Sequence, residues 1–249
     1  MIRRHDQIGC SQRIALEWLE QTAAYALAGM PVAHITEALE ELLSGKVSVD
    51  NQPDRGTRQK AISILRQIWC VEDDECHLLR TRGLRLLSQS PKGKRIVYHW
   101  GMIIAAYPFV AVVAEQVGRL LQLQATVGAA QVQRRLRERY GERETVARAA
   151  RRILRSFIDW GALDETDSKG LYRAGRQVRI DDSQSAAWLI EAFVHSHQNG
   201  RCTLSEALST RVLFPFEMPP LSCESLLQHA PGLDAVHRGI ESDVVALRV

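Results

Sequence analysis

Apolar residues recur three and four positions apart through the first half of the chain, the spacing of a helix that packs one face against a core. This pattern predicts helices over residues 13–28, 32–43 and 57–69. Ser11 is a possible N-cap of the first helix, and Gly29 is placed to end it.

A fourth helix is predicted to open at the four acids of residues 72–75, because negative charge is favourable at a helix N-terminus. Its spacing places the apolar residues on one face and the arginines on other faces. The apolar set is Leu79, Gly83, Leu86 and Leu87, and the arginines are Arg80, Arg82 and Arg85.

Residues 96–114 contain no charged side chain, and a run of 19 approaches the length that spans a bilayer. Pro108 interrupts this run, His99 lies inside it, and several of its residues are small. Two buried helices that meet at Tyr107 and Pro108 explain the pattern better than a membrane span. We therefore expect no membrane partner.

The pattern changes after residue 124. A short β-prone piece at 125–127 precedes helices over about 129–140 and 143–160, with Gly141 between them. The second helix is strongly amphipathic and is followed by Gly161 and a β-hairpin that ends near Arg173. Strand, helix, tight turn, basic helix and hairpin form the element order of a winged helix-turn-helix.

The last segment repeats this plan in a degenerate form. An apolar helix that begins near Ala186 precedes a short helix, a helix capped by Ser222 and two strands, 232–237 and 244–249. These strands are predicted to join at Arg238 and Gly239. The predicted fold is mainly α, with an N-terminal helical domain at 1–124, a winged helix-turn-helix at 125–180 and a winged-helix-like unit at 181–249.

Composition places the chain among ordinary globular proteins, with 45% hydrophobic and 24% charged residues in 249. The net charge of +3 is mild but unevenly distributed. Residues 76–95 hold six Lys or Arg and no Asp or Glu, and residues 128–157 hold nine Lys or Arg and three Glu. Two short basic blocks in a neutral to acidic chain are typical of a surface for a polyanion.

Arginine is suited to bidentate contact with guanine edges and with phosphates. Arg143, Glu144, Thr145 and Arg148, near the start of the second helix, are best placed for base edges. Other cations are assigned to the phosphate backbone or, for Lys169 in the hairpin, to the minor groove. The backbone candidates are Arg134, Arg135, Arg151, Arg152 and Arg155, and from the first basic block Lys92, Lys94 and Arg95.

Signals of catalysis and of metal binding are weak. The five cysteines are scattered, without the paired C-x-x-C spacing of a zinc site, and they suit a reducing cytoplasm. The P-loop, G-x-G-x-x-G, H-E-x-x-H and G-x-S-x-G motifs do not occur. We expect no catalytic residue, no metal and no cofactor. A charged N-terminus without a following apolar run predicts no signal peptide, and therefore a cytoplasmic protein.

The layout resembles that of the small BrxA-type DNA-binding proteins of bacterial BREX phage-defence systems. The residues that carry this resemblance lie at 134–136, 149–154, 159–163, 200–201, 213–214 and 244–247. The resemblance covers most of the chain in element order, contains no diagnostic motif and transfers no catalytic residue. It implies a helical protein with winged-helix-like modules that takes part in antiviral defence.

The sequence thus predicts a non-enzymatic protein that binds double-stranded DNA as one component of a multi-protein system. The acidic C-terminal unit is expected to contact other proteins of that system. Two alternatives stay open. The winged helices could form an adaptor that binds proteins only, or the chain could be a transcription regulator, which would need a dimer and a palindromic site.

Overall fold

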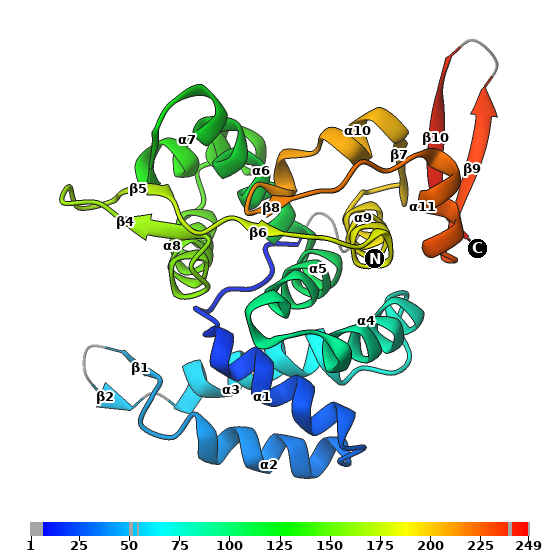
Figure 1. The fold of residues 1–249 in the computed structure, drawn as a ribbon. Helices are drawn as coiled ribbons and strands as arrows, with labels where there is room; N and C mark the ends of the chain where they lie inside the picture. The colour runs from blue at the N-terminus through cyan, green and yellow to red at the C-terminus, as the bar shows by residue number, and fades with distance from the viewer. Residues whose placement is uncertain (1–6, 50–51, 54, 239–240, 249) are drawn as a thin grey trace.

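A computed structural model describes residues 7–49, 52–53, 55–238 and 241–248. Over these residues the protein is mainly α-helical with small β-sheets, which confirms the predicted fold class. Figure 1 shows the first four helices, in blue to cyan, in the lower part of the view, with α5 (Ile96–Ala106) and α9 (Ser183–His195) in the middle. Two β-hairpins, one at the left and one at the right, project from opposite sides of the upper part.

The first half of the chain forms six α-helices in the described residues, a short 3-10 turn and one small hairpin. They are α1 (Leu16–Leu27), α2 (Val32–Leu42), β1 (Ser48–Val49), β2 (Gln52–Pro53), α3 (Arg55–Trp69), α4 (His77–Gln89), η2 (Lys92–Lys94), α5 (Ile96–Ala106) and α6 (Pro108–Leu123). The predicted helices are all present, although their ends shift.

The first helix begins at Leu16, so Ser11 is not its N-cap, contrary to the prediction. The carboxylate of Asp159, 143 positions later, accepts the backbone N–H of Leu16 at 2.8 Å. Just before it, the N–H of Ile14 donates to the hydroxyl of Ser156 at 2.9 Å. The capping group therefore comes from a distant helix, and these contacts hold residues 14–16 against α8.

The fourth helix also begins later than predicted, at His77, so the acids of residues 72–75 lie in the preceding loop. Asp74 accepts the backbone N–H of Cys76 at 3.0 Å there. Arg80, predicted to lie away from the apolar face, is instead buried with a relative exposure of 3%.

The uncharged run forms two helices that meet at Tyr107 and Pro108, as predicted. Every residue of α5 is buried, and α5 packs against α9. No helix within the described ranges is by itself long and apolar enough to cross a membrane. One helix pair, Lys92–Ala106 with Pro108–Leu123, passes on length and composition and is bent by 117°.

The central unit follows α6 in the predicted order. Its elements are β3 (Thr126–Gly128), α7 (Ala129–Tyr140), α8 (Glu144–Asp159), β4 (Leu163–Glu165) and β5 (Leu171–Ala174). The three strands form an antiparallel sheet in the order β3-β5-β4, so the hairpin pairs back onto the strand that precedes α7.

The C-terminal unit repeats this arrangement with an insertion. The strand β6 (Val178–Arg179) lies just before the predicted boundary and pairs in parallel with β8 (Phe216–Glu217). The elements that follow β6 are α9 (Ser183–His195), β7 (Arg201–Thr203), α10 (Leu204–Ser209), η3 (Arg211–Leu213), β8, α11 (Cys223–His229), β9 (Leu233–Arg238) and β10 (Glu241–Leu247). The sheet order β7-β10-β9 matches that of the central unit, and Ser222 caps α11 as predicted. Gly239, at the predicted joint of the last two strands, lies outside the described residues.

An aromatic cluster joins the three regions. Trp100 of α5 is fully buried and stacks on Phe157 of α8 with ring centres 4.7 Å apart. Phe214 and Phe216, from the C-terminal unit, contact the same indole edge-on at 5.5 and 5.7 Å. The buried apolar residues form one continuous core. The domain boundaries at 124 and 180 stay predictions.

Candidate nucleic-acid interface

The helix α8 is strongly amphipathic, and its buried face fixes the direction of its arginines. Val146, Ala150, Ile153 and Phe157 are buried at helical spacing, as predicted. Glycine at 141 precedes the helix with φ +83°, a left-handed conformation that other residues rarely adopt. Because the buried face of α8 packs into the core, the opposite face of the helix points into solvent.

Three arginines, Arg148, Arg151 and Arg155, lie on that outer face and are all exposed; we call them the arginine stripe. Steps of three and four residues keep them on one side of the helix. Arg148 forms an ion pair with Glu144 at 2.8 Å, and Arg155 forms one with Glu165 at 2.8 Å. Within the described ranges, Arg151 has no ion pair.

These two ion pairs are exposed, with more than half of each side chain accessible to solvent. Exposed pairs of this kind contribute about 0–1 kcal/mol, so a phosphate can replace the carboxylate partner at little cost. The hydrogen bond and the charge of Arg148 lower the pKa of Glu144, which keeps that carboxylate ionised. From the sequence we assigned Glu144 to base edges and identified neither ion pair; Glu165 lies on the hairpin, ten positions after Arg155.

The hairpin β4–β5 projects beside the arginine stripe, and Lys169 is exposed in its turn. A cavity of about 450 Å³ separates the hairpin from α8. Arg151, Arg155 and Lys169 line it together with Glu165 and Asp167. We call this cavity the hairpin groove.

The remaining candidates on α8 differ in accessibility. Arg143 and Thr145 are exposed at the start of the helix, and the Arg143 guanidinium donates to the carbonyl of Tyr140 at 3.0 Å. Arg152 is half-buried and donates to the amide oxygen of Gln12 at 2.9 Å. It is therefore held by the N-terminal segment and lies outside the stripe.

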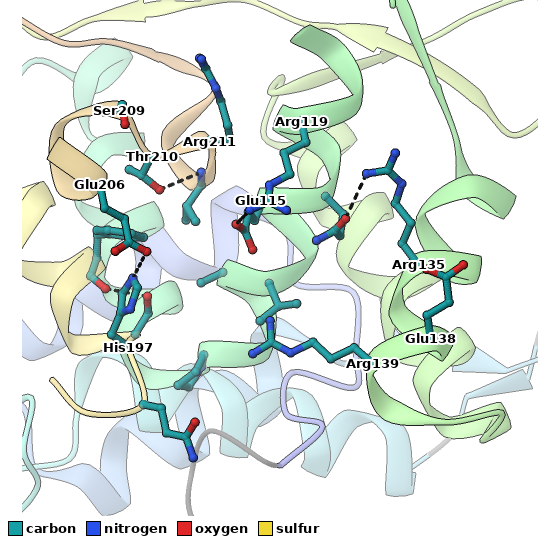
Figure 2. Close-up of a pocket in the computed structure, with 18 of the residues that line it drawn as sticks. Glu115, Arg119, Arg135, Glu138, Arg139, His197, Glu206, Ser209, Thr210 and Arg211 are labelled. Carbon is teal, nitrogen blue, oxygen red and sulfur yellow. Dashed lines mark hydrogen bonds and ion pairs between the residues drawn. The ribbon is translucent and has the colours of Figure 1, made fainter. Parts of the chain in front are cut away.

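The candidates on α7 face a second, larger cavity of about 1040 Å³. Figure 2 shows this cavity between α6 and α7 on one side and the segment from the end of α9 to η3 on the other. Arg134 is exposed at its edge, and Arg135 donates to Gln116 at 3.5 Å. We call this cavity the inter-unit groove.

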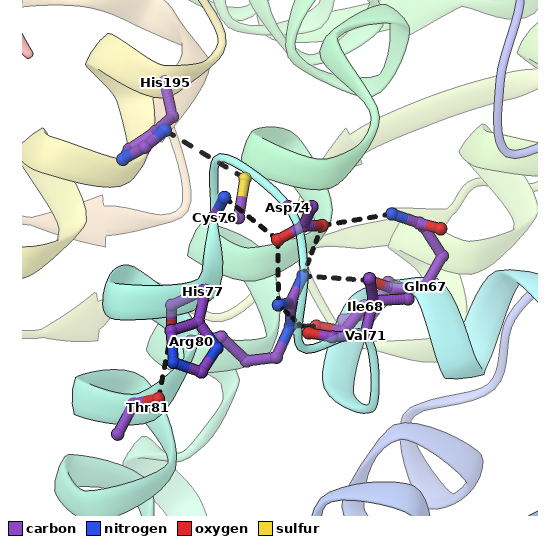
Figure 3. A network of polar contacts seen from close by, with 9 residues as sticks. All are labelled: Gln67, Ile68, Val71, Asp74, Cys76, His77, Arg80, Thr81 and His195. Atoms are coloured by element: carbon purple, nitrogen blue, oxygen red, sulfur yellow. Dashed lines mark hydrogen bonds and ion pairs between the residues drawn. The ribbon is translucent and has the colours of Figure 1, made fainter. Parts of the chain in front are cut away.

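Most cations of the first basic block, residues 76–95, are less accessible than the arginine stripe, and Arg80 is the clearest example. Its guanidinium donates to both carboxylate oxygens of Asp74, at 2.9 and 3.0 Å, and to the carbonyls of Gln67, Ile68 and Val71. Figure 3 shows this network with the guanidinium directed at Asp74. Arg80 is thus a structural residue that holds the loop before α4.

Most of the other cations of this block are paired as well. Arg82 forms a bidentate pair with the buried carboxylate of Glu191. The pairs Lys94 with Asp181 and Arg95 with Glu20 involve two of the predicted contact residues. Lys92 is exposed and has no ion pair within the described ranges. Arg85 is likewise exposed without an ion pair there, and the Lys94 pair is exposed to solvent, so Arg80 and Arg82 are the two cations that the fold holds most firmly inside.

One buried cysteine and histidine approach each other across the core. The thiol of Cys76 lies 4.0 Å from Nδ1 of His195, and both side chains are buried. Within the described residues, no group of three or more His, Cys, Asp or Glu is arranged to hold a metal ion.

Comparison of the chain with protein-family models, curated proteins and solved structures finds no match.

Proposed function

We propose that the protein binds double-stranded DNA without catalysis, through the central unit. The observation that carries this proposal is the arginine stripe of α8, which lies exposed on a rigid scaffold beside a projecting hairpin. Such a helix fits the major groove, and Lys or Arg along it contacts the phosphates on either side.

The order of elements supports a winged-helix interpretation. Helix α6, strand β3, helices α7 and α8 and the hairpin β4–β5 follow one another, and the hairpin pairs back onto β3. In a helix-turn-helix the second helix lies in the major groove, which assigns this position to α8. The hairpin then acts as the wing.

We assign a proposed DNA contact to each candidate side chain from its exposure to solvent and its position on α8 or the hairpin. Arg143, Thr145 and Arg148, at the start of α8, are assigned to base edges. Arg151 and Arg155 are assigned to phosphates, and Lys169 in the hairpin turn is assigned to the minor groove.

The experiment compares two triple variants in fluorescence anisotropy titrations with a labelled duplex. One carries Arg148→Gln, Arg151→Gln and Arg155→Gln, and the control carries Lys60→Gln, Arg85→Gln and Arg201→Gln, which remove three exposed cations outside the central unit. We expect the stripe variant to reduce the slope of log Kd against log salt by about 2, one for each lost phosphate contact, and the control to reduce it much less. Equal binding by wild type and stripe variant would overturn the proposal.

A second candidate is an adaptor that binds other proteins, and one apolar surface favours it. Leu208 is 40% exposed and lines a cavity of about 430 Å³ with Phe214 and Met218 of the C-terminal unit. A contact made by such side chains survives salt concentrations that abolish duplex binding. The salt titration therefore separates the two functions. A role in phage defence, with the C-terminal unit contacting other components, is supported only by the BrxA-type resemblance in layout.

A further inference from the structure

More arginines line the inter-unit groove than line the hairpin groove or the apolar cavity near Leu208. Most of these arginines play no part in the proposed contact of α8. Five arginines and three glutamates line it. The arginines are Arg119, Arg134, Arg135, Arg139 and Arg211, and the acids are Glu115, Glu138 and Glu206. The groove lies between α6 and α7 on one side and the segment from the end of α9 to η3 on the other, so it exists only because the C-terminal unit packs against α6.

Two of the acids are already engaged inside the groove. Glu115 forms an ion pair with Arg119 at 2.6 Å, and Glu206 lies 3.8 Å from His197. Burial lowers the pKa of His197, although the charges of Glu206 and Glu115 oppose this effect, so the imidazole adds no charge at neutral pH. Glu206 therefore keeps its negative charge, and the free charge of the groove is set by the remaining arginines together with Glu206 and Glu138.

Three of these arginines are exposed and have no ion pair within the described ranges: Arg134, Arg139 and Arg211. Figure 2 shows Arg139 reaching from α7 toward the middle of the groove, opposite the α10 side. Against them stand Glu138, which is exposed at the rim, and Glu206, whose histidine partner is uncharged; with Arg135 counted, the arginines still outnumber these two acids. Uncompensated guanidinium groups in a concave site focus positive potential and attract anions.

The groove continues toward the start of α8. A smaller cavity of about 300 Å³ shares Pro108, Arg139 and Gln198 with the inter-unit groove and adds Arg143 to the lining. Exposed arginines thus follow one another from Arg211 to the N-terminus of α8. A backbone that passes the start of α8 would therefore meet Arg143 and Arg139 in turn.

The lining selects for phosphate and against a base. Phe193 is buried and its ring is covered edge-on by His197 at 4.7 Å, and the Arg139 guanidinium lies 5.5 Å from the ring centre of Tyr140. Proteins usually hold unpaired nucleotides by stacking the bases on aromatic rings, and Phe193 is too deeply buried to act in this way. Charge without a stacking surface is the signature of a sequence-independent backbone contact.

We propose that the inter-unit groove binds the phosphodiester backbone of nucleic acid, independently of sequence, and continues the contact made by α8. The inference rests on the proposed function, because the path is useful only if a duplex lies on α8. It adds Arg139 and Arg211 to the interface and gives the packing of the C-terminal unit a role in binding.

The test uses the full chain with Arg139→Gln and Arg211→Gln together, and Lys60→Gln with Arg85→Gln as a control that removes two exposed cations from α3 and α4. Two lost phosphate contacts should weaken binding about 60-fold at about 0.1 M salt, because each contact contributes about eightfold there. The slope of log Kd against log salt should fall by about 2. Both effects are expected on two duplexes of unrelated sequence, each of about 40 base pairs, because the contact is made to the backbone and not to the bases.

The outcomes separate this inference from the proposed function. A groove variant that binds both duplexes with wild-type affinity and slope overturns the inference, whatever the stripe variant does. Lost binding in the groove variant with normal binding in the stripe variant would keep the backbone contact in the groove but overturn both the role of α8 and the continuation of its contact into the groove. The last measurement is a calorimetric titration of the wild-type protein and the groove variant with pyrophosphate. One tight site lost in the groove variant, with unchanged duplex binding, would assign the groove to a free phosphate compound and overturn the backbone contact.

Discussion

The two basic blocks carry the same formal excess of positive charge, and the fold treats them in opposite ways. In the first block, Arg80 and Arg82 are directed inward, and the carboxylates of Asp74 and Glu191 neutralise them. In the second block, the arginine stripe of α8 stays in solvent with weak, exposed partners. A run of arginines in a sequence therefore identifies a binding surface only after its partners in space are known.

Among the substitutions that test this difference between the two blocks, the one at Arg80 is expected to change stability most. We expect Arg80→Met to lower the free energy of unfolding by about 3–5 kcal/mol, because Asp74 and three carbonyls lose their buried donor. Urea denaturation measures this value. The exposed neighbour provides the control, since Arg85→Met on the same helix should change stability by no more than about 0.5 kcal/mol.

The stripe variant should behave like Arg85→Met in the same urea experiment, because its side chains are exposed. If the stripe variant lost as much stability as Arg80→Met, the two blocks would not differ in the way described here.

A somewhat smaller effect is expected at Arg82, whose side chain keeps a relative exposure of 20%. Arg82→Met leaves the carboxylate of Glu191 buried without its cation, and we expect a loss of about 2–4 kcal/mol in the free energy of unfolding. The double variant Arg82→Met with Glu191→Leu should recover most of that loss, because no buried charge remains. A double variant as unstable as the single one would show that Arg82 acts by packing alone.

Arg95 of the first block belongs to a group of charged and titratable residues that makes the free energy of unfolding depend on pH. Glu20 lies 3.3 Å from Arg95 and 3.2 Å from the buried ring of His99. Burial lowers the pKa of His99 below its usual 6.5, and the Glu20 charge opposes this without reversing it. Burial raises the pKa of Glu20, but the hydrogen bonds and charges of His99 and Arg95 outweigh burial and lower that pKa below 4.5.

The pKa shifts of His99 and Glu20 change the stability in the same direction as the pH changes. The unfolded chain binds more protons than the folded protein below pH 6.5 at His99 and below pH 4.5 at Glu20, so stability falls as the pH falls through these ranges. We expect His99→Phe to flatten the dependence between pH 6.5 and 5 in urea titrations. An unchanged pH profile in that variant would place the titrating group elsewhere.

The smallest effect is expected at the hairpin, where Glu165 partly neutralises the stripe. Glu165→Gln frees Arg155 and removes a charge that repels phosphate, so duplex affinity should rise about twofold to fivefold, the value of one exposed ion pair. Glu224→Gln on α11 removes an equally exposed acid outside the central unit and serves as the control. Weaker binding by Glu165→Gln would show that Glu165 positions Arg155 for the duplex.

Much of the fold could be predicted because it depends on local periodicity. The helices of the central unit, the glycines at 141 and 161, which both have positive φ, and the hairpin all lie where the pattern placed them. The start of α1 could not be predicted, because its cap is the carboxylate of Asp159 and not a neighbouring side chain. The inter-unit groove was missed for a similar reason, since Arg211 is isolated in the sequence and joins the α7 arginines only in space.

The sequence by itself determined where helices and turns form and which face of each helix is apolar, because these depend on residues within a few positions of one another. Only the tertiary structure decided which charges remain free. Arg82 meets Glu191 across 109 positions, and Lys94 meets Asp181 across 87. Coulomb energy depends on distance in space and on burial, neither of which is a property of the linear order of residues.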